Sequence, residues 1–80
     1  MTLYHLENCP FCIDVRRSAQ ALEIELELVD IGRNPESRAM LMERRGRATV
    51  PVLGIVKDDA ECLMGESRDI IEYLRGLAAA

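Results

Sequence analysis

Two cysteines, Cys9 and Cys12, stand where a short apolar segment gives way to a helical pattern. A thiol is nucleophilic only as the thiolate, and an ordinary cysteine with a pKa near 8.5 is only about 3% ionised at pH 7. A helix N-terminus favours an anion through its free N–H groups and the positive end of its dipole. Pro10 suits a first helical position, so a helix should begin just after Cys9. We therefore expect Cys9 to be the attacking thiolate of a redox pair and Cys12 the resolving thiol.

Two other interpretations of the cysteine pair stay open. Structural zinc prefers four ligands, often as two closely spaced pairs, and His5 and Cys62 are the only further imidazole and thiol. No pair spacing links them, so we expect no bound metal. The two cysteines could also be buried without any chemistry, but Pro10 at a strand–helix junction favours the redox interpretation.

The hydrophobic pattern predicts the elements that position the cysteines. Strands are expected at 2–6, 24–29, 50–56 and 60–64, and helices at 10–22, at 36–45 and after Ser67, the expected N-cap of the last helix. The strict alternation in 24–29 indicates a strand with one solvated face, and Gly46 ends the second helix. The first two strands should be parallel, with a right-handed crossover, and 60–64 should be an edge strand. The order β-α-β-α-β-β-α with a C-x-x-C motif predicts a thioredoxin-like α/β fold.

Length and composition narrow the function classes. The chain has 80 residues, which fits one domain over 1–80, and its net charge of −4 leaves no basic surface for nucleic acid. No segment approaches the roughly 20 apolar residues needed to span a membrane, and the first residues do not resemble a signal peptide. The odd count of 3 cysteines argues against a secreted disulfide scaffold, so we expect a cytoplasmic protein.

Two motifs give the chain a family resemblance that spans almost its whole length. The segment Cys9-Pro10-Phe11-Cys12 closely matches the C-P-Y-C of dithiol glutaredoxins, and Thr49-Val50-Pro51 matches their T-V-P. Tyr4 also precedes the cysteines at a spacing that resembles that of glutaredoxins. The resemblance implies that Pro51 is cis and faces the cysteine pair, and that the backbone of Val50 pairs with the cysteinyl part of glutathione. An ordinary trans proline at the start of a strand is the alternative.

A third segment, Gly65-Glu66-Ser67, resembles a different branch of the same superfamily. Glutaredoxins usually carry G-G-x-D-D here, whereas this chain resembles the E-S-x-x-I-x-x-Y-L segment of the N-terminal domain of glutathione transferases. The resemblance implies that Glu66 binds the α-ammonium of glutathione and Ser67 its α-carboxylate, which agrees with a helix N-terminus as an anion site. Arg47 could bind the glycyl carboxylate or remain a solvated loop residue. Phe11 should pack near the ligand.

Five residues outside these motifs also bear on the expected site and fold. Leu6 stands where glutaredoxins often carry a lysine that helps hold the thiolate and the carboxylate of the ligand. For His5 we expect a strand-edge role, and for Cys62 a small core residue. Arg16 and Arg17 lie in the first helix, and one of them could approach the site, but a surface role is expected for each.

The residues and the resemblance together imply a glutaredoxin-like, glutathione-dependent thiol–disulfide oxidoreductase. It would act as a monomer in cell redox homeostasis, reducing glutathione mixed disulfides and protein disulfides with glutathione as co-substrate. Its partners would be glutathionylated or disulfide-containing proteins. Three alternatives remain: a transferase-type N-terminal domain that binds glutathione, a module that holds an iron–sulfur cluster between two subunits through Cys9 and glutathione, and a partner domain without activity.

Overall fold

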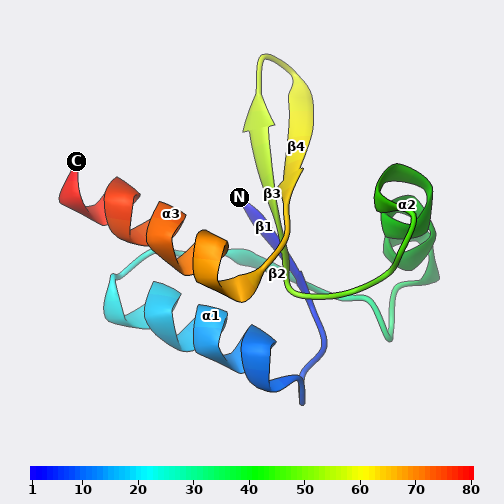
Figure 1. Cartoon of the computed structure of the whole chain (residues 1–80), viewed down its shortest axis with the longest axis horizontal. Helices are drawn as coiled ribbons and strands as arrows, with labels where there is room; N and C mark the ends of the chain where they lie inside the picture. The colour runs from blue at the N-terminus through cyan, green and yellow to red at the C-terminus, as the bar shows by residue number, and fades with distance from the viewer.

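The computed structural model describes residues 1–80, which form four strands and three helices in the order β-α-β-α-β-β-α (Figure 1). The strands are β1 (Thr2–His5), β2 (Glu27–Asp30), β3 (Val52–Lys57) and β4 (Ala60–Met64), and the helices are α1 (Pro10–Ala21), α2 (Pro35–Arg45) and α3 (Ser67–Ala79). The sheet order is β2-β1-β3-β4, with β1 parallel to β2 and the other two pairs antiparallel. This is the thioredoxin-like architecture expected from the sequence.

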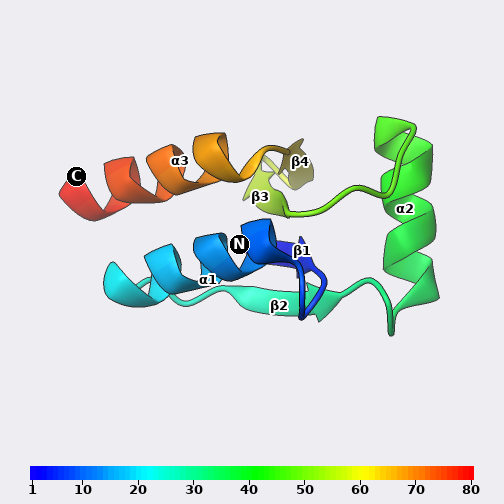
Figure 2. The same ribbon diagram turned by 60° about the horizontal axis from the view of Figure 1, so that its bottom comes forward.

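The sheet separates two apolar clusters. Helices α1 and α3 lie side by side on one face, and α2 covers part of the other (Figures 1 and 2). Successive residues of β1 alternate between the faces, so Leu3 joins the α1–α3 cluster and Tyr4 joins the α2 cluster. Both clusters reach β3, where Leu53 and Val52 are buried on opposite faces. No helix is long and apolar enough to cross a membrane.

The expected strand 24–29 is displaced toward its C-terminal end. Strand β2 begins only at Glu27, because the chain leaves α1 through a turn at Glu23, whose φ is +57°. The N–H of Ile24 donates to the carbonyl of Ala19 at 2.9 Å, which keeps Ile24 against the end of the helix. Ile24 and Leu26 then pack on the α1–α3 cluster without joining the sheet. The apolar residues at the start of this segment therefore serve core packing, and strand pairing begins only at Glu27.

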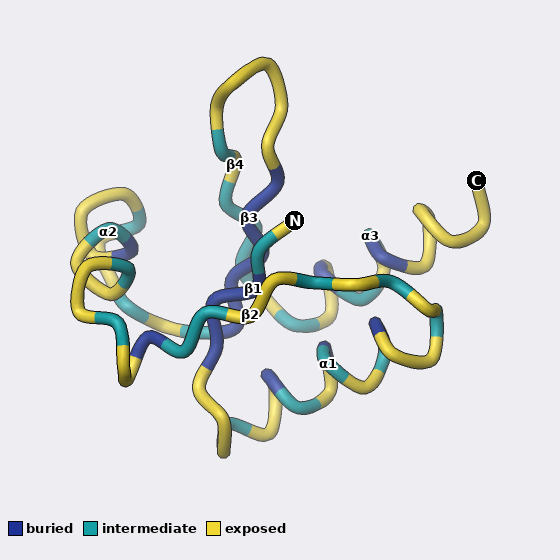
Figure 3. The backbone as a smooth tube through the Cα atoms, turned by 180° about the vertical axis from the view of Figure 1, so that it is seen from behind, coloured by how far each residue is buried: buried dark blue, intermediate teal, exposed yellow.

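Two further expectations are wrong. Ser67 is the first residue of α3 and not its N-cap, a position that Glu66 occupies without a side-chain cap hydrogen bond. Cys62 is exposed, because β3 and β4 extend as a hairpin beyond the end of β1. Cys62 lies opposite Ile55, past the last β1–β3 pair at Gly54, and Figure 3 shows the exposed outer part of this hairpin.

A polar cluster fastens α2 to the outer strand of the sheet. The hydroxyl of Tyr4 donates to the carboxylate of Glu61 at 2.9 Å, and Arg44 of α2 donates to the Glu61 carbonyl at 2.6 Å. Arg44 also forms an ion pair with the same carboxylate at 3.8 Å. The carboxylate lies over Gly54, where a Cβ would overlap it. This cluster fixes the position of α2 and therefore of the loop that follows it.

Candidate functional site

Cys9 stands at the N-terminus of α1, as the sequence predicts. It is the N-cap residue, with extended backbone angles, and its carbonyl accepts the helix's first bond from Ile13 at 2.9 Å. Pro10 is the first helical residue, so the free N–H groups of the first turn lie directly beyond Cys9. Its thiol is half-buried, free and without a cap hydrogen bond. Cys9 therefore lies at the positive end of the α1 dipole.

Cys12 lies in a different environment one turn further along. Its thiol is free and fully buried. Burial raises the pKa of Cys12 to about 11, the neighbouring Cys9 adds to the rise, and the Leu6 backbone and the charge of Arg16 oppose it. The two thiols are therefore unequal, one partly accessible at a helix terminus and the other protonated in the core at neutral pH.

A single pocket of about 260 Å³ gathers every residue proposed above for glutathione binding. The three segments that form it are far apart in sequence but meet where the chain from α2 to β3 passes the starts of α3 and α1 (Figures 1 and 2). Its lining residues are Phe11, Arg45, Arg47, Thr49, Val50, Pro51, Gly65, Glu66 and Ser67. Phe11 is 61% exposed, which leaves its ring available to a ligand.

The segment before β3 has the backbone that the resemblance implied. The peptide bond between Val50 and Pro51 is cis, and Pro51 is buried. Val50 takes part in no backbone–backbone hydrogen bond, so its N–H and C=O are free for an extended ligand. Thr49, beside it, is exposed at the pocket.

Glu66 has an unusual backbone conformation inside this pocket. Its φ is +64° and its ψ is 116°, a region that non-glycine residues adopt at a cost of about 1–3 kcal/mol. The first intrahelical bond of α3 runs from Ile70 to the Glu66 carbonyl, so the N–H groups of Ser67 and the next two residues are free. The result is a carboxylate and an anion-binding helix terminus side by side, two opposite charges that suit an amino acid's α-ammonium and α-carboxylate.

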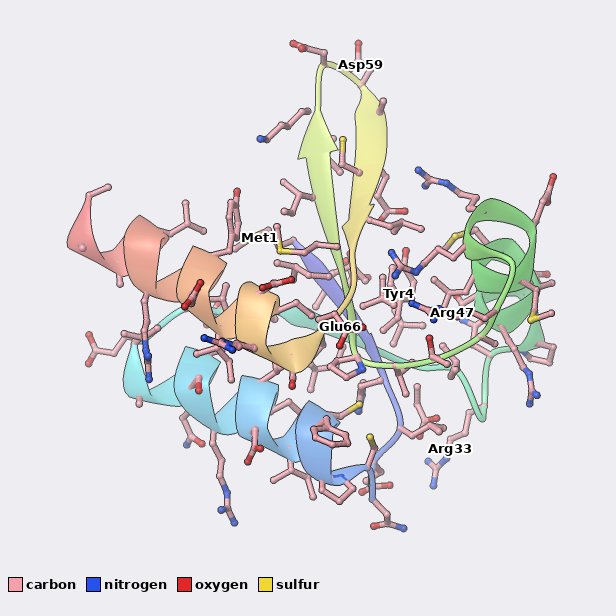
Figure 4. All side chains as sticks on the ribbon, in the orientation of Figure 1. Met1, Tyr4, Arg33, Arg47, Asp59 and Glu66 are labelled. Carbon is pink, nitrogen blue, oxygen red and sulfur yellow. The ribbon has the colours of Figure 1, made fainter.

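Arg45 is a pocket residue that the sequence did not reveal. It is the last residue of α2, where a basic residue ordinarily interacts with the helix dipole. In the structure its guanidinium packs against Gly65, and its Nε is buried without a hydrogen-bond partner. With Arg47 it gives the pocket two cationic groups. Figure 4 labels Arg47 and Glu66, which come from different segments of this pocket. The only feature of the sequence that could have indicated the contact between Arg45 and this segment is Gly65, directly before Glu66-Ser67, because a glycine leaves room for a neighbouring side chain.

Cys9 itself does not line this pocket. It lines a second hollow of about 580 Å³ with residues of the loop after β1 and of the end of β2 and the loop after it: Leu6, Glu7, Asn8, Asp30, Gly32 and Arg33. Phe11, two residues further along, lines the first pocket. The start of α1 therefore separates two hollows, one with the predicted binding residues and one with the predicted nucleophile.

Three further residues for which the sequence predicted a role are Arg16, Arg17 and His5. Arg17 is exposed, as expected, and Arg16 is half-buried, with an exposed hydrogen bond from its Nη2 to the Glu7 carbonyl at 2.8 Å. His5 ends an inner strand, so its expected strand-edge role is wrong. His5 is buried, its Nδ1 has no partner, and burial together with Arg16 lowers its pKa.

Comparison with known protein families gives a match over almost the whole chain. The family model described as "Glutathione S-transferase, N-terminal domain" matches residues 3–80. A search of curated proteins finds no match. No group of three or more His, Cys, Asp and Glu side chains is placed to hold a metal ion.

Proposed function

The chain belongs to the family of glutathione S-transferase N-terminal domains, and on this premise we propose that it is a glutathione-dependent thiol–disulfide oxidoreductase. One observation carries the proposal: the pocket with the predicted glutathione-binding residues lies beside the helix start that bears a C-x-x-C motif. The family match supports a function related to glutathione. The specific redox activity rests on Cys9 and Cys12.

All three residues of glutathione would bind in the pocket. Its γ-glutamyl group would place the α-carboxylate at the N-terminus of α3 beside Ser67 and the α-ammonium near Glu66. Its cysteinyl backbone would pair with the free N–H and C=O of Val50. Its glycyl carboxylate would meet the guanidinium of Arg47 or Arg45, since both line the pocket. In this orientation the glutathione sulfur points toward the start of α1.

Reduction of a glutathionylated protein would follow two exchange steps. The Cys9 thiolate attacks the glutathione sulfur, a Cys9–glutathione disulfide forms, and the substrate leaves as a thiolate that takes a proton from solvent. The thiolate of a second glutathione then attacks the glutathione sulfur of this mixed disulfide. Oxidised glutathione leaves and the Cys9 thiolate is restored.

Reduction of a protein disulfide would also use Cys12. Cys9 forms a mixed disulfide with one substrate sulfur, and Cys12 then attacks Cys9, which releases the reduced substrate and leaves a Cys9–Cys12 disulfide. Two glutathione molecules reduce that bond and leave as oxidised glutathione. The buried thiol thus acts second, which agrees with its lack of exposure. A cytoplasmic location and a monomeric state remain predictions that accompany this proposal.

A transferase-type domain that binds glutathione without reductase activity is the second candidate. The Glu66-Ser67 segment and the family match favour it, as does the absence of Cys9 from the pocket lining. A conjugation assay with a model electrophile separates the two candidates. The oxidoreductase proposal predicts disulfide reduction and no conjugation.

The direct test is a disulfide-reduction assay with glutathione and glutathione reductase, on a glutathionylated peptide and on a protein disulfide. We expect Cys9→Ser to be inactive on both substrates. Cys12→Ser should keep its activity on the glutathionylated peptide and lose it on the protein disulfide. Equal loss in the two variants would reject the roles assigned to the cysteines.

A further inference from the structure

Arg16 is a half-buried cation that the proposed exchange steps do not use. It stands four residues after Cys12 in α1, so the two side chains share one face of the helix. Its Nη2 donates to the Glu7 carbonyl at 2.8 Å, and its Nε is buried without a partner. Arg17, the next residue, is exposed. The partial burial of Arg16 is therefore specific to this arginine and not a general feature of the helix.

The hydrogen bond from Arg16 to Glu7 connects helix α1, which carries Cys12, to the loop that leads to Cys9. Residues 6–8 join β1 to α1 and lead directly into Cys9. Helical side chains lean toward the N-terminus, so Arg16 reaches back past the turn that holds Cys12 to grip this loop. Arg16 thus links the segment that carries the attacking sulfur to the helix that carries the resolving one.

The charges around Cys12 give this arginine a second effect. Burial disfavours the Cys12 thiolate, and Arg16 is the positive charge that opposes this cost. Burial and the charge of Arg16 lower the pKa of His5 in β1, so His5 stays neutral and adds no second cation at neutral pH. Asp30, at the end of β2, and Glu7, in the loop after β1, also act on His5. The charged side chains of α3, the helix packed against α1, are exposed: Arg68, Asp69, Glu72 and Arg75.

We propose that Arg16 is a positioning residue that enables Cys12 to act as the resolving thiolate, by holding a positive charge beside it and by tying its helix to the loop that leads to Cys9. The inference rests on the proposed redox function. In the step concerned, Cys12 loses its proton to solvent and its thiolate attacks the Cys9 sulfur of a Cys9–glutathione disulfide. The Cys9–Cys12 bond forms, the Cys9–glutathione bond breaks, and glutathione leaves as a thiolate. Arg16 touches no reacting atom.

The test measures ring closure in a Cys62→Ser background, where only the two site cysteines remain. The protein is mixed with oxidised glutathione, quenched with acid at intervals, and the mixed disulfide and the ring are counted by mass spectrometry from pH 6 to pH 9. Arg16→Gln should slow ring closure several-fold at pH 7 and displace its pH profile to higher pH. Arg16→Lys should recover part of the rate, because it restores the charge. Arg17→Gln, the matched control, should behave as the wild type.

A second measurement separates this role from a general structural one. In the Cys12→Ser background no ring can close, and Arg16→Gln should change the rate of glutathione transfer to Cys9 much less than it changes ring closure. Equal slowing of both reactions, equal slowing by Arg17→Gln, or an unchanged pH profile in Arg16→Gln would overturn the inference. If the wild type itself forms no Cys9–Cys12 disulfide, the proposed dithiol function fails. If it does and Arg16→Gln matches it, only the role of Arg16 fails.

Discussion

The guanidinium of Arg45 lies so close to Gly65 that a Cβ on Gly65 would overlap its Nη2 atom. The last residue of α2 is thereby held against the segment that opens α3, and both residues line the pocket that we propose for glutathione. Tyr4 donates to the Glu61 carboxylate and Arg44 donates to the Glu61 carbonyl, and these bonds hold α2 in the position that allows this contact. The cationic side of the pocket thus depends on a helix that lies across the sheet from the cysteines.

The first prediction concerns Gly65→Ala. The added methyl should displace the Arg45 guanidinium from the pocket and weaken glutathione binding several-fold, measured by isothermal titration calorimetry. Stability should change little, because the displaced atoms end a flexible side chain. Gly76→Ala is the control, since no atom lies within 4 Å of a Cβ at that position. It should leave binding unchanged and stabilise α3 by about 1 kcal/mol. Equal binding by both variants would contradict the role of Arg45.

The second prediction separates strain from binding at Glu66. Because glycine adopts a φ of +64° without the cost paid by other residues, Glu66→Gly should raise the unfolding free energy by about 1 kcal/mol in urea titrations. The same substitution removes the carboxylate proposed for the α-ammonium, so glutathione affinity should fall. Glu66→Gln should lose affinity without gaining stability. A Glu66→Gly protein that binds glutathione as tightly as the wild type would exclude Glu66 from the site.

The third prediction concerns stability at high pH. Burial, followed by the hydrogen bond to Glu61, raises the pKa of Tyr4 to about 12. Between pH 10 and pH 12 the unfolded chain loses this proton while the folded chain keeps it, so stability falls as pH rises. The Tyr4 contribution to this loss is on the order of 2 kcal/mol. Tyr4→Phe should be less stable at pH 8 and lose less stability between pH 9 and pH 12. Parallel curves for Tyr4→Phe and the wild type would contradict the assignment.

The fourth prediction concerns acid. Burial lowers the pKa of His5, so below its ordinary value near 6.5 the unfolded chain binds a proton that the folded chain resists. Stability should therefore be fully present above about pH 6.5 and fall as the pH drops below it. His5 is the single histidine, so His5→Gln should remove the pH dependence between pH 5 and pH 7. The measurement is the urea midpoint at each pH, and an unchanged slope in His5→Gln would reject this source.

Features set by neighbours in sequence could be predicted from the sequence. Pro10 after Cys9 specifies the start of α1, and Gly46, with its φ of +73°, ends α2 as expected. The sequence predicts most of the pocket residues through three motifs: Cys9-Pro10-Phe11-Cys12, Thr49-Val50-Pro51 and Glu66-Ser67. The structure brings Phe11 and the last two motifs together in one pocket. Whether they bind glutathione remains a prediction.

Features set by tertiary packing could not be predicted in this way. The burial of Arg16 depends on the path of the loop at Glu7, and the place of Arg45 depends on Gly65 from another segment. Cys62 follows the pattern of a core strand but lies where the hairpin has passed the end of β1. Each of these positions depends on how far one element extends past another, which hydrophobic periodicity does not encode.

The most direct test of the account asks where glutathione is attached when the protein meets oxidised glutathione. In Cys12→Ser at pH 7, peptide mass spectrometry should find glutathione on Cys9 well before it appears on Cys62, even though Cys62 is the more exposed thiol. This preference would come from the helix terminus at Cys9 and from the adjacent pocket. Modification of Cys62 first, or of both thiols at the same rate, would contradict it.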